Sequence, residues 1–350
     1  MAVEPRKKGG SAGIATSSGR SIPGSYAGTR PALPESVETR KIGSLEVSVV
    51  GLGGNNFGGR LDLEATRAVV DAALDAGINF FDTADIYGGT KSEEFLGRAL
   101  EGRRDRVVLA TKFGMEVDPK RKGAKPDYVR RACEDSLRRL RTDRIDLYQL
   151  HQPDPDTPIG DALEVLDLLV KAGKVREIGC SNFSADQIRE SHELPGYGAA
   201  CFVSVQNEYS LLHREPEVEV LPECERLGLA FIPYFPLASG VLTGKYTSGA
   251  HASKGRLSDP GRSRDRFLND RNRLIARKLA GFAESRGHTL LELAFSWLLA
   301  CKPVASVIAG ATKPDQVRAN AKAAGWKLTE EEIWEVDRIA PLEEDLARAG

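Results

Sequence analysis

A lysine, an aspartate and a tyrosine are the side chains in this sequence whose types and spacing could move a proton. Asp82 ends the apolar run 79–82, and Lys112 follows the apolar run 107–110, so both should lie at strand ends. A buried ammonium is costly without a partner, and a carboxylate on the neighbouring strand can supply one. Tyr87 lies five residues beyond Asp82. A lysine cation beside a tyrosine stabilises the phenolate, so this tyrosine could donate a proton to a carbonyl oxygen.

A histidine is the fourth candidate, because His151 follows the next apolar run and could hydrogen-bond the same substrate oxygen. Taken singly, each of the four has an ordinary structural interpretation, since strand-end ion pairs are usually structural and lone histidines usually pack at a rim. Four such groups at the ends of three successive strands instead predict an acid–base site.

Eight short apolar runs alternate with amphipathic segments and would position these side chains. Near-continuous apolar runs are typical of strands that are buried on both faces, and strand–helix alternation indicates a parallel sheet. Eight units in one chain favour a (β/α)8 TIM barrel, with the reactive side chains at the C-terminal ends of the strands. The runs are 49–52, 79–82, 107–110, 145–148, 175–178, 202–205, 230–233 and 306–308; the predicted helices are 63–76, 126–140, 158–172, 184–193, 216–227, 313–323 and the accessory helix 329–340.

The two ends of the chain differ in composition from this middle part. Residues 1–36 are rich in Gly, Ser, Pro and Ala, and we expect a disordered tail there. Two short alternating runs around Gly43 and Ser44 then predict a β-hairpin. We expect the barrel domain to cover residues 37–342, followed by a C-terminal tail, 343–350.

Composition narrows the class of protein. The 350 residues carry a formal net charge of −1, which gives no reason to expect nucleic acid or a membrane as a partner. The five cysteines are widely spaced, which favours reduced thiols over a disulfide framework or a thiolate metal site. No apolar stretch reaches the roughly 18 residues of a membrane span, and no secretory signal is evident. We therefore expect a cytoplasmic protein.

Six ordered motifs resemble the aldo-keto reductase superfamily, and they cover about residues 38–340. In particular, they resemble a bacterial branch similar to the potassium-channel β-subunit-like reductases. The resemblance implies a catalytic tetrad of Asp82, Tyr87, Lys112 and His151, with Tyr87 as the proton donor and no metal. The motifs begin with Phe80-Phe81-Asp82-Thr83-Ala84-Asp85-Ile86-Tyr87-Gly88, Ala110-Thr111-Lys112-Phe113-Gly114 and Leu147-Tyr148-Gln149-Leu150-His151; the others lie at 178–183, 206–210 and 234–240.

The resemblance also implies NADPH or NADP+ as the cofactor and a small carbonyl or alcohol as the substrate. Ser181, Asn182 and Gln206 would hold the nicotinamide carboxamide, and Tyr234 would stack on the ring. Gly53, Gly54 and Asn55 would lie near its ribose, and Lys245 would contact the pyrophosphate. The remaining candidate cofactor residues are Pro236, Leu237, Ala238, Gly240, Gly310, Thr312, Lys313, Gln316 and Asn320.

The adenosine end departs from the pattern of many family members, which place a Lys-Ser pair and an Arg after the last strand. This chain has Gly310-Ala311 and Gln316 there. Lys313 and Arg318 could supply positive charge, and a helix N-terminus near Pro314 favours an anion. NADPH is therefore preferred, with NADH possible. The long connection 235–269 is rich in arginine and lysine, and we expect it to touch an anionic ligand.

The sequence has three alternative interpretations. A Rossmann dehydrogenase is disfavoured because Asn56 replaces the third glycine of the partial motif that begins at Gly51. A metal-dependent barrel hydrolase needs clustered ligands, whereas the five histidines are scattered. A cofactor-bound regulatory or redox-sensing subunit with little turnover would keep the same tetrad and stays open.

Overall fold

The computed structural model describes residues 37–342, apart from 195, 197, 247–256 and 258–260. Every described residue belongs to one compact unit, which spans Pro34–Gly350. The two predicted tails, 1–36 and 343–350, lie outside the described residues.

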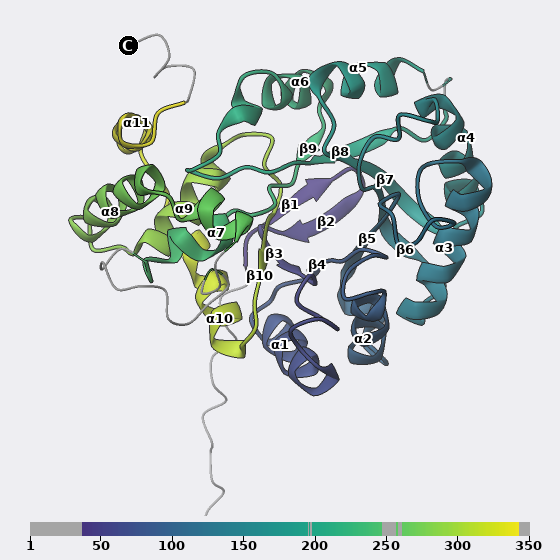
Figure 1. Ribbon diagram of the computed structural model, residues 1–350, viewed down its shortest axis with the longest axis horizontal. Helices are drawn as coiled ribbons and strands as arrows, with labels where there is room; N and C mark the ends of the chain where they lie inside the picture. The colour runs from purple at the N-terminus through teal and green to yellow at the C-terminus, as the bar shows by residue number, and fades with distance from the viewer. Residues whose placement is uncertain (1–36, 195, 197, 247–256, 258–260, 343–350) are drawn as a thin grey trace, which may run out of the picture. The chain divides into compact units, whose positions relative to one another are not determined.

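Eight parallel strands form one sheet, and a two-stranded antiparallel hairpin precedes them, as the sequence predicts (Figure 1). The strand order is β10-β3-β4-β5-β6-β7-β8-β9, so strands that follow one another in the chain are neighbours in the sheet. The hairpin is β1 (Thr39–Ile42) and β2 (Leu45–Ser48); the sheet is β3 (Val50–Gly53), β4 (Phe80–Asp82), β5 (Val108–Phe113), β6 (Ile145–Leu150), β7 (Val175–Ser181), β8 (Phe202–Gln206), β9 (Ala230–Phe231) and β10 (Val307–Gly310).

The two edges of this sheet meet. The backbone N–H of Phe231 in β9 donates to the carbonyl oxygen of Pro303 at 2.7 Å. In return, the N–H of Ala305 donates to the carbonyl oxygen of Phe231 at 3.0 Å. Because Pro303 and Ala305 lead into β10, these bonds close the sheet into a barrel, and the predicted (β/α)8 fold is confirmed.

Helices surround the strands, and most begin and end within a residue or two of the prediction. The segment predicted as the helix 216–227 was wrong at its start, because a 3-10 turn (Glu215–Glu217) precedes α6 there. None of the described helices is both long and apolar enough to cross a membrane. The helices are α1 (Leu63–Asp75), α2 (Lys91–Ala99), α3 (Pro126–Leu140), α4 (Ile159–Lys171), α5 (Ala185–Glu193), α6 (Val220–Leu227), α7 (Arg262–Phe267), α8 (Asp270–Glu284), α9 (Leu290–Ala300), α10 (Pro314–Lys322) and α11 (Glu330–Ile339).

The sequence did not predict the four helices α2, α7, α8 and α9. The segment of α9 is almost continuously apolar, and all but a few of its side chains are buried. Periodicity cannot distinguish such a run from a buried strand. Five of the nine residues of α2 are polar, and two of these, Ser92 and Glu93, are buried, so its inward face carries polar groups that conceal the helical pattern.

The hairpin fills the N-terminal end of the barrel. Ile42, Leu45 and Val47 form one buried apolar cluster with inward-facing residues of the strands, such as Phe80 and Leu147. A separate and larger apolar cluster lies between the strands and the surrounding helices. The barrel interior is thus packed at this end, which leaves the opposite end for a ligand.

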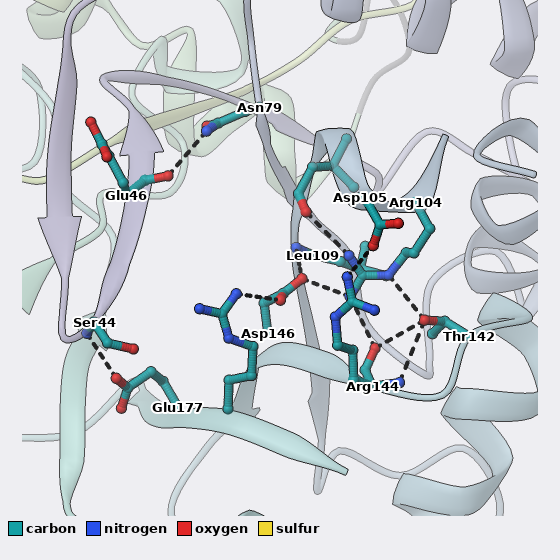
Figure 2. A network of polar contacts seen from close by, with 12 residues as sticks. Ser44, Glu46, Asn79, Arg104, Asp105, Leu109, Thr142, Arg144, Asp146 and Glu177 are labelled. Carbon is teal, nitrogen blue, oxygen red and sulfur yellow. Dashed lines mark hydrogen bonds and ion pairs between the residues drawn. The ribbon is translucent and has the colours of Figure 1, made fainter. Parts of the chain in front are cut away.

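Polar contacts fasten the hairpin and the strand starts to one another (Figure 2). The N–H of Ser44 donates to Oε1 of Glu177 in β7 at 2.8 Å, and Nδ2 of Asn79 donates to the carbonyl oxygen of Glu46 at 3.0 Å. Nearby, the buried carboxylate of Asp146 accepts from Nη2 of Arg104 at 2.6 Å. These contacts lie where strands begin, the end of a barrel that serves stability.

Candidate active site

The C-terminal ends of the strands border a cavity of about 910 Å³. Its lining takes residues from the ends of β3, β4, β7, β8 and β10 and from the loops that follow several strands. Asp82, Tyr87 and His151 line this cavity. Lys112 does not line the cavity, because its side chain is completely buried in the wall behind them. All four candidates are therefore brought to one end of the barrel.

A buried ion pair lies at the centre of this group. Nζ of Lys112 donates to Oδ2 of Asp82 at 2.5 Å and to the carbonyl oxygen of Thr83 at 2.9 Å. The same Nζ lies 5.3 Å from the centroid of the Tyr87 ring. The phenol thus borders both the cation and the cavity.

The other oxygen of Asp82 is held by two amides. Nε2 of Gln149 and Nε2 of Gln206 both donate to Oδ1 of Asp82 at 3.1 Å. Gln206 was predicted to bind the nicotinamide carboxamide, and here it lines the cavity while its amide donates to this carboxylate. No role for Gln149 was predicted from the sequence, although a glutamine inside the apolar strand β6 was the available signal.

Electrostatics keep Lys112 charged. Burial alone lowers the pKa of this lysine, but the charges of Asp82 and Tyr87 and hydrogen bonds to both raise it, so the pKa lies above its ordinary value. The interaction with Tyr87 is reciprocal, because a phenolate that stabilises an ammonium is itself stabilised by it. The arrangement therefore eases proton loss from Tyr87.

His151 is a neutral imidazole in this setting. Burial, and then the positive charge of Lys112, lower the pKa of His151 to about 3. Its ring meets the Tyr87 ring edge-on, with the centroids 5.7 Å apart. Nδ1 of His151 is buried and has no hydrogen-bond partner within the described part of the chain. A neutral imidazole carries one donor and one acceptor, so it can hydrogen-bond a ligand oxygen in the cavity.

The ends of four strands are linked beside the tetrad. Nδ2 of Asn182, whose backbone is left-handed with φ 62°, donates to the carbonyl oxygen of His151 at 2.8 Å. The hydroxyl of Tyr234 donates to Oδ1 of Asn182 at 2.8 Å, and Oγ of Ser181 donates to the carbonyl oxygen of Gln206 at 2.7 Å. Burial raises the pKa of Tyr234 to about 12, so this second cavity tyrosine stays a phenol.

Most of the other predicted cofactor residues also line the cavity. Three do not. Gly54 is packed against Ser92 and the backbone of Asp82, Ala238 is fully buried, and Lys313 is exposed outside the lining. Those that line it are Gly53, Asn55, Ser181, Asn182, Gln206, Tyr234, Pro236, Leu237, Gly240, Lys245, Gly310, Thr312, Gln316 and Asn320.

The connection after β9 supplies a cation to the cavity. Gly240 has a φ of +95°, and a Cβ added there would come within 2.7 Å of Nζ of Lys245. The glycine thus leaves the space in which this ammonium lies. Arg266 in the same connection pairs with Glu208 at 2.7 Å, and Lys254 and Arg256 lie outside the described residues. Of the seven basic residues in and just beyond this connection, Lys245 is the described one that lines the cavity.

These features suit a nicotinamide dinucleotide. Such a ligand is long, anionic and rich in hydrogen-bonding groups, and the cavity offers cations together with buried polar atoms that lack partners. Oδ1 of Asn55 is one such atom, and Nδ1 of His151 is another. A Cβ at Gly310 would come within 3.0 Å of the same Asn55 oxygen, so the glycine keeps this corner open. The residues present therefore fit the cofactor.

Several lining residues were not predicted. They include Asn56 and Arg60 from the loop after β3, Met115 and Gln152 beyond β5 and β6, and Leu291 at the start of α9. Loop side chains of this kind carry no pattern in the sequence, because only the folded chain shows which of them face the cavity. Among the described residues, no group of three or more His, Cys, Asp or Glu side chains could hold a metal ion. The five cysteines all belong to the described part and are free thiols.

A closed parallel barrel with an Asp–Lys–Tyr–His group at its C-terminal end defines a class of barrel oxidoreductases, and comparison with known proteins gives the family. Residues 49–341 match the model of the Aldo/keto reductase family. The chain belongs to this family, whose members are generally NAD(P)H-dependent carbonyl reductases.

Three curated relatives support this assignment across most of the chain. The chain is 34% identical to "Probable aldo-keto reductase 1" of Glycine max, over 87% of this chain and 90% of the relative. It is 35% identical to "Aldo-keto reductase YhdN" of Bacillus subtilis (strain 168), over 84% and 90%. It is 36% identical to "Aldo-keto reductase str7" of Strobilurus tenacellus, over 86% and 91%.

Proposed function

We propose that this protein reduces aldehydes or ketones to alcohols with NADPH, reversibly, and that Tyr87 donates the proton. The observation that carries the proposal is the buried cation of Lys112, held by Asp82 and lying 5.3 Å from the centroid of the Tyr87 ring at the edge of the cavity. A phenol in this position can lose its proton to an oxygen that becomes negatively charged.

The chemistry divides between cofactor and protein. When bound, the cofactor supplies the hydride that reduces the carbonyl carbon. The protein supplies the proton: Tyr87 gives it to the carbonyl oxygen, and the Lys112 cation stabilises the phenolate that remains. The neutral imidazole of His151 hydrogen-bonds the same oxygen and orients the substrate. In the reverse direction the phenolate removes the alcohol proton.

The remaining cavity residues would bind the cofactor. Ser181, Asn182 and Tyr234 form the linked wall against which a nicotinamide ring can lie, and Lys245 faces the cavity as a counter-ion for a diphosphate. NADPH is proposed over NADH because a dinucleotide with an additional phosphate suits a cavity that is lined by more than one cation. The free thiols agree with a reducing compartment, and we place the protein in the cytoplasm.

Replacement of Tyr87 by phenylalanine tests the proposal. With a panel of aldehydes and ketones, the variant should lose about 10²–10⁴ in kcat/KM for carbonyl reduction, because only the transferable proton is removed. NADPH affinity, measured by fluorescence titration, should change little. Tyr128→Phe removes a hydroxyl outside the cavity lining and serves as the control for general damage. Turnover near wild type in the Tyr87 variant, or NADPH binding without turnover in wild type, would contradict the proposal.

A further inference from the structure

Gln149 is a fully buried amide that lies at the level of Lys112 in the barrel. In the sheet register it is the partner of Lys112 in β5 on one side and of Gly179 in β7 on the other. A Cβ at Gly179 would come within 3.3 Å of Cγ of Gln149, closer than an ordinary contact between carbon atoms. The glycine thus leaves the space in which the Gln149 side chain lies.

The Gln149 amide joins two groups of the active site. Its Nε2 donates to Oδ1 of Asp82 at 3.1 Å, and its Oε1 accepts from Nε2 of Gln206 at 3.2 Å. Nε2 of Gln206 also donates to Oδ1 of Asp82 at 3.1 Å. The three side chains therefore form a closed triangle of hydrogen bonds, in which Gln149 contacts both a member of the tetrad and a residue that lines the cavity.

The charge of Asp82 decides which way both amides turn. A carboxylate only accepts hydrogen bonds, and Asp82 is paired with the Lys112 cation, so each glutamine turns its nitrogen towards it. With its nitrogen on Asp82, Gln149 offers its oxygen to Gln206. A primary amide has two N–H donors, so Asp82 and Gln149 together take both donors of Gln206.

The carbonyl oxygen is then the polar atom of the Gln206 side chain that remains for the cavity. An oxygen of this kind accepts and cannot donate, so it suits an N–H group of a ligand and disfavours a methyl group or another oxygen. If Gln149 were apolar, the Gln206 amide would keep its contact with Asp82 but lose the partner of its second N–H. The direction of its oxygen would no longer be fixed.

We propose that Gln149 is a positioning residue that locks the Gln206 amide, so that the cavity presents a fixed acceptor oxygen to an N–H donor of its ligand. The inference rests on the proposed function, in which this donor is the carboxamide of the nicotinamide ring. Gln149 is not among the residues that line the cavity, so it acts through Gln206.

Two dinucleotides that differ only at this group test the inference without turnover. NADP+ carries a carboxamide, and in its 3-acetylpyridine analogue a methyl group replaces the NH2. In calorimetric titrations of the full chain, wild type should bind NADP+ about 10- to 100-fold more tightly, because the analogue leaves the Gln206 oxygen unpaired. In Gln149→Met, which keeps the length of the side chain without its amide, this ratio should fall below about threefold.

The ratio of the two affinities separates positioning from damage, because a general loosening of the site weakens both ligands alike. Ser204→Ala is the matched control. It removes a buried hydroxyl of β8 that has no hydrogen-bond partner in the described part of the chain, and it should keep the ratio within about twofold of wild type. Gln149→Asn is a second variant that retains an amide. Its side chain is one methylene too short to reach both partners, so the ratio should fall again.

A double-mutant cycle shows whether Gln149 acts through Gln206. Gln206→Met should abolish the preference for NADP+ over the analogue, and adding Gln149→Met should change the ratio no further. Additive effects of the two substitutions, or a wild-type ratio in both Gln149 variants, would show that Gln149 does not position the amide. Equal binding of the two dinucleotides by wild type would also overturn the inference. Failure of wild type to bind NADP+ at all would instead contradict the proposed function.

Discussion

Replacing Lys112 with methionine should separate the structural role of the buried ion pair from its chemical role. Methionine keeps most of the length of the side chain but removes the charge and the hydrogen bond to the carbonyl oxygen of Thr83. In the variant, Asp82 remains buried without its cation, while the amides of Gln149 and Gln206 still donate to Oδ1 at 3.1 Å.

The expected cost follows from these contacts. Removing one partner of a buried ion pair costs about 3–5 kcal/mol, because the other charge is left uncompensated. The two remaining amide donors place Lys112→Met near the lower end, at about 3 kcal/mol. The double variant Asp82→Asn/Lys112→Met has no buried charge at this position. It should therefore regain most of the lost free energy of unfolding.

Activity should not return with stability. Both variants lack the cation that stabilises the Tyr87 phenolate, so carbonyl reduction should stay about 10²–10⁴ below wild type. The alkaline limb of the pH–rate profile should also move to higher pH. Tyr87 must be protonated to act as the acid, and its pKa rises towards the usual value of about 10 or above when the cation is removed.

Urea unfolding at neutral pH measures the free energy of unfolding, and pH profiles of kcat/KM measure the activity, on the same preparations. The reasoning fails if the double variant recovers activity together with stability, because the pair would then act only through the fold. It also fails if Lys112→Met keeps the wild-type alkaline limb, because Tyr87 would then not sense the charge of Lys112.

Two further predictions concern the pH dependence of stability. The pKa of His151 is about 3 in the folded protein, against an ordinary value of 6.5, so between these pH values the unfolded chain binds a proton that the folded chain refuses. Stability should therefore fall by up to about 1.4 kcal/mol per pH unit on acidification, and His151→Gln should remove this contribution to urea unfolding. Burial and the nearby charge of Glu93 raise the pKa of Asp85 from 3.8 to about 7, so the folded chain holds a proton that the unfolded chain has lost. Stability should fall as pH rises from 3.8 to about 7. At pH 8, Asp85→Asn should therefore unfold at a higher urea concentration than wild type. Equal urea midpoints for the two proteins would show that wild type bears no cost from a buried Asp85 carboxylate.

The fold was predictable because its signal is repeated. Eight buried strands each leave a short apolar run, and the four missed helices do not alter that count. The helices α2 and α9 were missed because one buries polar side chains and the other is apolar all round, so neither shows the expected period. Order along the chain was enough to predict the barrel even without them.

The site was predictable only where it depends on strand ends. Asp82 and Lys112 lie at the ends of β4 and β5, and His151 directly follows β6, so strand order brings them together. Gln149 and Arg60 needed the folded chain: the first donates to Asp82 from the middle of an apolar motif, and the second reaches the cavity from a loop. Loop positions depend on contacts between segments far apart in sequence, such as Asn56 with Ala311.

A buried ion pair by itself does not mark the active site of this barrel. Asp146, at the opposite end, is as deeply buried as Asp82 and accepts from both Arg104 and Arg176. Arginine stays protonated at any working pH, and the Asp146 pair does not line the cavity, so it can stabilise but cannot help to transfer a proton. What distinguishes the pair of Asp82 with Lys112 is its neighbour: the Tyr87 phenol lies between a fixed cation and a cavity that a ligand can enter. The chemistry follows from this juxtaposition, and moving either the cation or the phenol by one strand would leave two structural ion pairs and no proton donor.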